Sequence, residues 1–265
     1  MSILNTGRLF AKLLRPFSID VVCDIGSLNG ADALRFRRAA PGARIVAFEP
    51  NPSNYRAMRE SRALAAAGIE TLPYAISAHE GDAEFFIVPV AGPADLARRG
   101  MSSLHLRAEP VHRGRKIVVQ TRRLDGLLAE PARTGARIAL WIDAEGAAFE
   151  VLQGGLGILD AVQLLHVEVE TRACIGASQK LYPDVAGLLA DRGFVEIATD
   201  EPRDAMQFNS LYVRAALPAA LANLVERRVR HEARRRRLVR ATLAACPPRL
   251  RGYLLRMTQI PTAVG

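Results

Sequence analysis

The stretch DIGSLNG at residues 24–30 decides the fold of this chain. It ends a short apolar run, SIDVVC at residues 18–23, and precedes ADALRFRRAA at residues 31–40, whose apolar residues recur at helical spacing. Gly26 and Gly30 lack a side chain, so the backbone can turn tightly there and leave room for a ligand. The sequence therefore predicts a buried strand, a ligand-binding turn and a helix, in that order.

Strand and helix patterns alternate along the rest of the chain. Because such alternation builds a mainly parallel sheet covered on both faces, we expect an α/β fold with a doubly wound, seven-stranded sheet. The last two strands are close enough in sequence to form an antiparallel hairpin at its edge. The strand patterns after the first are ARIVAFEPN (43–51), ETLPYAIS (70–77), KIVVQT (116–121), ARIALWIDAEG (136–146), AVQLLHVEVE (161–170), RGFVEIATD (192–200) and FNSLYVRAA (208–216).

Two segments add to this alternation. GDAEFFIVPV at residues 81–90 alternates in polarity and predicts an added β-hairpin element. Residues 91–115 contain glycine, proline and many charges, which predicts a mobile surface insertion.

The formal net charge of +9 lies in the C-terminal part of the chain. Residues 216–265 hold eleven Arg against Glu226 and Glu232, whereas the basic and acidic side chains of residues 1–215 balance. Residues 218–240 lack proline and glycine after the first position and predict a long basic helix. We therefore expect an α/β domain at 1–215 and an Arg-rich helical extension at 216–265.

Cysteine usage and hydropathy bear on the compartment. Cys23, Cys174 and Cys246 include no C-x-x-C pair, which favours a reducing cytoplasm. Residues 1–17 are basic and partly apolar, but cleavage there would leave almost no lead-in to a strand that begins at about Asp20. No apolar run approaches the roughly 18 residues of a spanning helix.

The turn DIGSLNG has the pattern D-x-G-x-x-x-G, not G-x-G-x-x-G. A pyrophosphate needs the second close glycine to approach a helix N-terminus, whereas S-adenosylmethionine carries an ammonium and a sulfonium and no phosphate. Asp24 would suit the ammonium, and Glu49, at the end of the second strand, could accept both ribose hydroxyls. Glu49 alone does not separate an adenosylmethionine site from a nicotinamide site.

Further motifs occur in a specific order, namely DIGSLNG, VAFEPNPSNY, YAISAHEGDAEFF, MSSL, QTRRLDGLL, WIDAEGAAFEVLQGG, VEVE and FNSLYVR. With these motifs the chain resembles the FkbM-type methyltransferases from about Asp20 to Arg214. The resemblance implies a class I, Rossmann-like methyltransferase fold, S-adenosylmethionine as methyl donor, and hydroxyl groups of small molecules or glycans as acceptors. The chain departs from the family pattern at Leu28, Ala78, Trp141 and Ala148.

Methyl transfer to a hydroxyl needs alignment and a base. Asp143 and Glu145 end one predicted strand and Glu168 and Glu170 end its neighbour, so four carboxylates can converge near the methyl group. Asp143 or Glu145 is the expected base, and His105 is a second candidate. In the alternative, structural interpretation, Glu145 caps the following helix and Glu168 pairs with an arginine.

Site residues are expected in three groups. The cofactor residues are Asp24, Gly26, Ser27, Asn29, Gly30, Glu49, Pro50, Asn51, Ala75, Ile76, Ser77 and Asp143. The acceptor residues are Glu168, Glu170, Ser102 and Ser103. No metal site is expected, and Mg²⁺ on Asp143 and Glu168 is a less favoured alternative because carboxylates without His or Asn partners indicate a metal poorly.

Alternative functions stay open from the sequence. The Arg-rich extension could hold RNA phosphates, although the neutral domain argues against nucleic acid; it could bind the anionic inner surface of a membrane, or pack on the domain or on a second subunit. A nicotinamide oxidoreductase and a non-catalytic binding module share the fold. The sequence favours a cytoplasmic O-methyltransferase and leaves its acceptor and its oligomeric state open.

Overall fold

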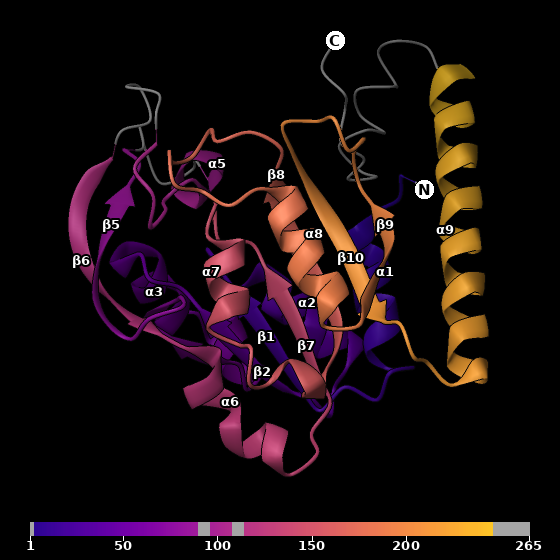
Figure 1. Ribbon diagram of the computed structural model, residues 1–265, viewed down its shortest axis with the longest axis horizontal. Helices are drawn as coiled ribbons and strands as arrows, with labels where there is room; N and C mark the ends of the chain where they lie inside the picture. Colours follow the sequence, from indigo (N-terminus) through magenta and orange to yellow (C-terminus); the bar gives the residue numbers. More distant parts are fainter. Residues whose placement is uncertain (1–2, 90–95, 108–113, 246–265) are drawn as a thin grey trace.

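A computed structural model describes residues 3–89, 96–107 and 114–245. Its centre is a seven-stranded sheet in the order β3-β2-β1-β7-β8-β10-β9 (Figure 1). These strands are β1 (Val21–Ile25), β2 (Arg44–Phe48), β3 (Glu70–Leu72), β7 (Ile138–Ile142), β8 (Val162–Glu170), β9 (Phe194–Thr199) and β10 (Gln207–Arg214). The doubly wound, mainly parallel sheet predicted from the sequence is confirmed.

The direction of the chain across the sheet reverses between β1 and β7. From β1 the chain moves outward through the parallel strands β2 and β3, and from β7 it moves outward on the other side through β8. β10 runs antiparallel to both β8 and β9, so the predicted edge hairpin is confirmed. In such sheets the ligand crevice opens at the strand carboxyl ends where the order reverses, here beyond Ile25 and Ile142.

Two hydrophobic cores cover the two faces of the sheet. One core contains buried side chains of α6, α7 and α8, and the other contains those of α1, α2, α3, α4 and α9. Because both faces are covered, β1 and β7 are buried along their whole length. The helices are α1 (Thr6–Leu14), α2 (Ala31–Ala39), α3 (Pro52–Arg59), α4 (Arg62–Ala66), α5 (Leu96–Gly100), α6 (Leu124–Arg133), α7 (Ala148–Gln153), α8 (Tyr182–Asp191) and α9 (Ala219–Ala245).

A second sheet has the order β4-β6-β5, with β4 (Tyr74–Ile76), β5 (Gly81–Ile87) and β6 (Arg115–Arg122). The strand predicted at 70–77 divides at Pro73 into β3 and β4, which belong to different sheets. β5 pairs antiparallel with β6, although the insertion separates the two strands in the sequence. The expectation of mobility for 91–115 falls in part on residues 90–95 and 108–113, which lie outside the described residues.

The N-terminal helix α1 is a packed part of the fold that the sequence patterns did not indicate. Asn5 caps it by accepting a hydrogen bond from Arg8 N at 2.7 Å. Phe10 is fully buried and meets Phe36 and Trp141 edge-on, with ring centroids 5.2 and 5.4 Å away. These aromatic contacts fix α1 against α2 and β7.

Helix α9 confirms the long basic helix predicted in the C-terminal extension and packs beside α1. Val225 is buried in the core shared with α1 and α2. Glu232 is 1% exposed and lies 3.2 Å from Lys12, 3.7 Å from Arg8 and 3.3 Å from Arg235. The domain boundary at residue 215 stays a prediction, and these contacts join both sides of it. Within the described ranges, no helix is both long and apolar enough to cross a membrane.

We predict that Glu232→Ala lowers the free energy of unfolding by roughly 1 to 3 kcal/mol, because it removes the buried acceptor that joins α9 to α1. Chemical denaturation monitored by circular dichroism would measure the change. The matched control is Glu226→Ala on the same helix, whose exposed pair with Arg230 should be worth less than about 0.5 kcal/mol. An equal effect of the two substitutions would contradict the anchoring role of Glu232.

Candidate active site

The turn after β1 touches the end of β7. Gly26 has φ +82°, and a Cβ at this position would lie 1.8 Å from the carbonyl oxygen of Asp143. Gly30 has φ +75°, and a Cβ there would lie 2.7 Å from Leu64. Both positions therefore need glycine for its positive φ and for the missing side chain.

Asp24 is buried beneath this turn and is 1% exposed. Its Oδ2 accepts hydrogen bonds from Ser27 Oγ at 2.6 Å and from Ala33 N at 3.1 Å. Burial, followed by the nearby charge of Asp32, raises the pKa of Asp24 to about 8. Asp24 thus fixes the turn to α2 and does not line the cavity next to it, where the sequence analysis expected it to meet an ammonium group.

The N-terminus of α2 is partly occupied by the chain's own side chains. Asp24 takes the N–H of Ala33, and Asn29 Oδ1 accepts from Ala31 N at 3.0 Å. A dinucleotide pyrophosphate binds to such free N–H groups at the end of a helix. This arrangement disfavours a dinucleotide and suits a ligand without phosphates.

Glu49 lies at the end of β2 and faces the same turn. Its two oxygens accept from Leu28 N at 2.7 Å and from Asn51 N at 2.8 Å. Burial raises the pKa of Glu49 to about 7. Leu28, one of the departures from the family pattern, adopts φ +57°, a left-handed conformation that Asn tolerates better than Leu.

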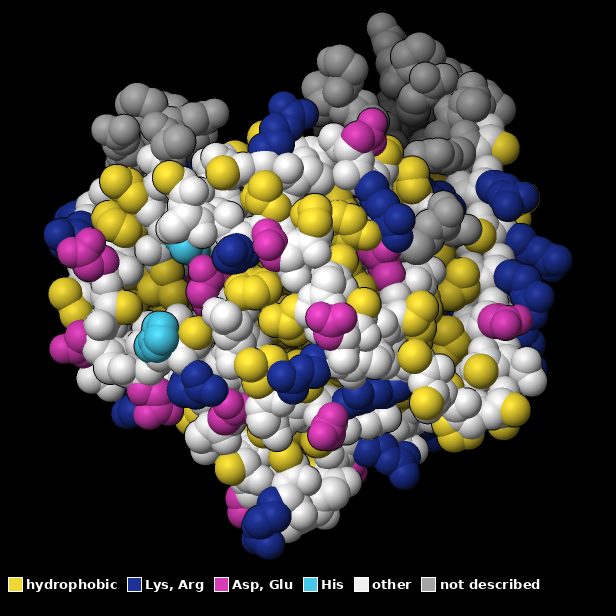
Figure 2. Space-filling view, viewed as in Figure 1, with side chains coloured by type: hydrophobic (Ala, Val, Ile, Leu, Met, Phe, Trp, Pro, Cys, Tyr) yellow, Lys and Arg dark blue, Asp and Glu magenta, His cyan; other side chains and the backbone are white. Residues whose placement is uncertain are grey.

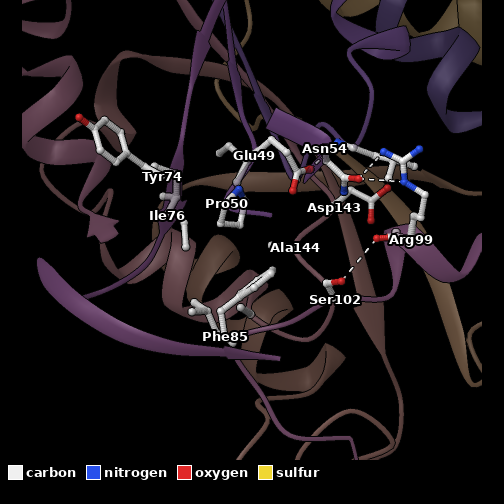
Figure 3. A pocket seen from close by; sticks show the side chains of 17 residues that line it. Glu49, Pro50, Asn54, Tyr74, Ile76, Phe85, Arg99, Ser102, Asp143 and Ala144 are labelled. Atoms are coloured by element: carbon white, nitrogen blue, oxygen red, sulfur yellow. Dashed lines mark hydrogen bonds between the residues drawn. The ribbon is translucent and has the colours of Figure 1, made fainter. Parts of the chain in front are cut away.

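A cavity opens beside this turn, between the main sheet, the small sheet and α5 (Figure 3). Glu49 and Asp143 supply carboxylates to its wall, and Tyr74, Ile76 and Phe85 supply an apolar surface. Arg99 of α5 donates to Asn54 Oδ1 at 3.0 and 2.6 Å. Two carboxylates beside an apolar surface are groups of the kind that bind the ribose hydroxyls and the base of an adenosine.

The predicted cofactor residues divide between this cavity and its support. Those that line the cavity are Gly26, Glu49, Pro50, Ala75, Ile76 and Asp143. Those that do not are Asp24, Ser27, Asn29, Gly30, Asn51 and Ser77, of which Asn51 caps α3. Further residues of the wall were not predicted, because their place depends on the small sheet, on α5 and on the contact of Asn54 of α3 with Arg99; they include Tyr74, Phe85, Asn54, Arg99 and Leu104.

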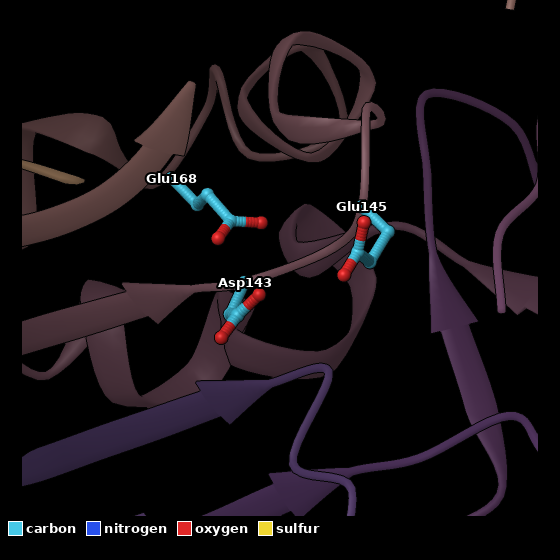
Figure 4. A group of neighbouring side chains, drawn as sticks. All are labelled: Asp143, Glu145 and Glu168. Atoms are coloured by element: carbon cyan, nitrogen blue, oxygen red, sulfur yellow. The ribbon is translucent and has the colours of Figure 1, made fainter. Parts of the chain in front are cut away.

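Three acids converge at the ends of β7 and β8. Oxygens of Asp143, Glu145 and Glu168 lie within 4.8 Å of one another (Figure 4). Burial and the charge of Glu145 raise the pKa of Asp143 to about 7, and burial with the charge of Asp143 raises the pKa of Glu168 well above its ordinary value. The cluster therefore retains a proton near neutral pH, which suits acid–base chemistry.

Glu145 and Glu170 have partners of their own. Glu145 adopts φ +43° and pairs with Arg107 at 2.5 Å, and the N-cap of α7 is Ala147, so Glu145 does not cap that helix. Glu170 accepts from Gln179 at 2.6 Å and Gln207 at 3.2 Å. Glu168 Oε2 is buried without a hydrogen-bond partner in the described part of the chain. Of the four acids, Asp143 lines the cavity beside Glu49 and a second cavity on its other side, whereas the predicted acceptor residues Glu168 and Glu170 line neither.

The segment that follows α5, between β5 and β6 of the small sheet, contributes three further predicted residues. Ser102 lines the cavity, whereas Ser103 Oγ donates to the backbone oxygen of Glu145 at 2.6 Å and holds that turn. His105 Nε2 lies 3.5 Å from Glu150 of α7, and His105 does not line the cavity. The structure therefore brings Ser102 to the cavity and directs His105 elsewhere.

A second cavity, of about 190 Å³, lies on the other side of Asp143. The N-terminal residues 4–7, Trp141, Asn209 and α9 surround it. Its volume greatly exceeds the roughly 10 to 15 Å³ that a single water needs, so it can hold a larger group. Asp143 lines both cavities and stands where their contents would meet.

Trp141 and His166 form one wall of this second cavity. Their rings stack with centroids 3.5 Å apart, and His166 Nε2 lies 3.0 Å from Thr6 Oγ1. Burial lowers the pKa of His166 well below its usual value, so the ring is neutral. His166 is thus a packed residue of β8, and Trp141, one of the departures from the family pattern, has a structural place beside it.

Comparisons with known proteins agree with this geometry. The model of the methyltransferase FkbM domain matches residues 24–196. The chain is 29% identical over 156 residues to the 2-O-methyltransferase NoeI of Sinorhizobium fredii, with 56% of this chain and 62% of that protein covered. The matched region thus spans about three fifths of that relative.

Two further relatives share this similarity. Methyltransferase sdnD of Sordaria araneosa is 30% identical, with 68% of this chain and 73% of that protein covered. The hexuronic acid methyltransferase AglP of Haloferax volcanii is 27% identical, with 57% of this chain and 56% of that protein covered. With its sheet order, its glycine turn and the matched domain, the chain belongs to the FkbM methyltransferase family.

Proposed function

We propose that this chain is an S-adenosylmethionine-dependent O-methyltransferase that acts on a hydroxyl group of a glycan or small molecule. The observation that carries the proposal is the position of Asp143, which lines both the cavity beside Glu49 and the cavity beneath α9. A donor in the first cavity and an acceptor in the second would meet at this carboxylate. Proximity of that kind is a large part of what an enzyme supplies.

Residues of the first cavity fit adenosylmethionine. The Glu49 carboxylate can accept the two ribose hydroxyls, and Tyr74, Ile76 and Phe85 can pack on the adenine. The partly capped N-terminus of α2 argues against the rival nicotinamide dinucleotide. When bound, adenosylmethionine supplies an electrophilic methyl group, whose carbon–sulfur bond breaks as the acceptor oxygen bonds to the carbon.

Asp143 would remove the proton from the acceptor hydroxyl. Its raised pKa makes it a stronger base than an exposed carboxylate, and a base with a pKa near the working pH is efficient. Glu168, beside it across the β7–β8 pair, would share that proton. Glu145 would raise the basicity of Asp143 by its charge while Arg107 holds it in place.

A divalent cation could also bind Asp143, Glu145 and Glu168, since hard cations take carboxylate oxygens. This is the less favoured alternative, because Glu145 already has an ion-pair partner in Arg107. The names of two relatives, a 2-O-methyltransferase and a hexuronic acid methyltransferase, support a sugar as the acceptor.

For the cofactor site, we predict that Glu49→Gln weakens S-adenosylhomocysteine by roughly 1.5 to 3 kcal/mol, because an amide cannot accept from two hydroxyls while facing two N–H groups. Calorimetry would measure this, with the exposed Glu60→Gln as the control. Since the pKa of Glu49 is raised to about 7, affinity should fall as the pH drops through that value. Unchanged affinity of Glu49→Gln would remove the ribose assignment.

For the base, we predict that Asp143→Asn lowers turnover by roughly a hundredfold or more and leaves S-adenosylhomocysteine affinity within a few-fold. In the unsubstituted enzyme kcat/KM should fall as the pH drops through about 7, because Asp143 then takes up a proton. Transfer of a labelled methyl group from adenosylmethionine to acceptors in a fractionated extract would report turnover.

Glu145→Gln provides the comparison for Asp143→Asn. It removes a negative charge that raises the pKa of Asp143, so the acid limb of the pH profile should move to lower pH. Full activity of Asp143→Asn together with an inactive Glu145→Gln would make Glu145 the base. Loss of activity in a chelator and its return with Mg²⁺ would favour the metal alternative.

A further inference from the structure

A groove of about 770 Å³ lies beside the contact between α1 and α9 and is lined by residues of α1, α2 and α9. Six cationic side chains line it, namely Arg8, Lys12, Arg15, Arg35, Arg228 and Arg235, and its lining includes no Asp or Glu from the described residues. A concave surface with one sign of charge concentrates small ions of the opposite sign. The charge of this groove therefore selects for an anion.

Only part of this positive charge is balanced nearby. Glu232 pairs with Arg8, Lys12 and Arg235, and Asp32 lies 2.8 Å from Arg35. Arg15 and Arg228 are exposed and have no acidic partner within residues 3–89, 96–107 and 114–245. The described groove thus has more cations than its two neighbouring acids can neutralise.

The groove adjoins the cavity proposed for the acceptor. Asn5 and Arg235 line both. Arg35, in the groove, lies 4.8 Å from the ring centroid of Trp141, whose ring lines the cavity. A molecule with one end in the groove could therefore extend past Trp141 toward Asp143.

We propose that the groove between α1 and α9 binds a phosphate or diphosphate group, and that the methyl acceptor is a phosphorylated hydroxy compound such as a sugar phosphate. The inference rests on the proposed function of Asp143. The forked guanidinium groups of arginine bind phosphate oxygens in pairs, and several converge here from α1, α2 and α9. In this arrangement α1 and α9 recognise the charged end of the acceptor, and its hydroxyl lies near Asp143.

The outer face of α9 differs from the groove. Arg227, Arg230, Arg234 and Arg237 are exposed there, and Figure 2 shows basic side chains along this edge of the molecule. A convex row of arginines suits a flat anionic surface such as a membrane, whereas the groove, which is concave and lined by three helices, suits a small ligand. The outer arginines therefore serve as a matched control of equal charge.

The experiment compares the double variants R15A/R228A, in the groove, and R227A/R234A, on the outer face. Calorimetric titration with inorganic pyrophosphate and with a hexose phosphate should show saturable binding to the unsubstituted protein. R15A/R228A should weaken both ligands by about tenfold, and R227A/R234A by less than about twofold. The free hexose should bind much more weakly than its phosphate.

Three controls decide the outcome. S-adenosylhomocysteine should bind all variants equally. If it did not bind the unsubstituted protein, the proposed function would be wrong. The pyrophosphate titration would still test the groove independently. Absence of pyrophosphate binding, or equal weakening by the two double variants, would overturn the groove. The protein could also bind phosphatidylserine vesicles. If R15A/R228A abolished that binding and pyrophosphate did not compete with it, the groove proposal would be overturned in favour of a lipid surface.

Discussion

The site depends on one close approach, in which the turn after β1 packs against the backbone that ends β7. Parallel pairing aligns Ile25 with Ile142, and Asp143 N donates to Ile25 O at 2.9 Å. Only a glycine at position 26 leaves room for the Asp143 carbonyl. This contact places Asp143 at the wall of the cofactor cavity, and a side chain at position 26 would force the two strand ends apart.

Burial then gives the acids at this sheet edge their chemical character. Removal from water raises the pKa values of Asp24, Glu49 and Asp143 to about 8, 7 and 7. Such groups stabilise the fold fully below their unfolded pKa values and lose that contribution as the pH rises through the folded ones. Ionisation of these buried acids near neutral pH therefore lowers the stability of the fold. They lie where a base and an acceptor for ribose hydroxyls are needed, and such perturbed pKa values are common in active sites.

Helices α1 and α9 enclose the second cavity from the two ends of the chain. Phe10 fixes α1 against Trp141, and Glu232 fixes α9 to α1 through Lys12 and Arg8. Trp141, at which the chain departs from the family pattern, therefore packs directly against α1. One side of α9 packs against the domain, and the other side carries exposed arginines. Different residues of this helix therefore provide its packing and most of its exposed charge.

The sequence by itself determined the parallel sheet, its edge hairpin, the glycine turn and the acids at the strand ends, because periodicity, glycine and strand termini are local properties. The tertiary structure decided which of those residues face a ligand. Asp24 accepts hydrogen bonds from Ser27 and Ala33 and does not line the cavity. His105 contacts Glu150, and the small sheet places Tyr74 and Phe85 in the cavity wall. Helix α1 acquired its place from the buried aromatic contacts of Phe10. These positions depend on contacts between residues that are distant in the chain, and local sequence patterns do not predict such contacts.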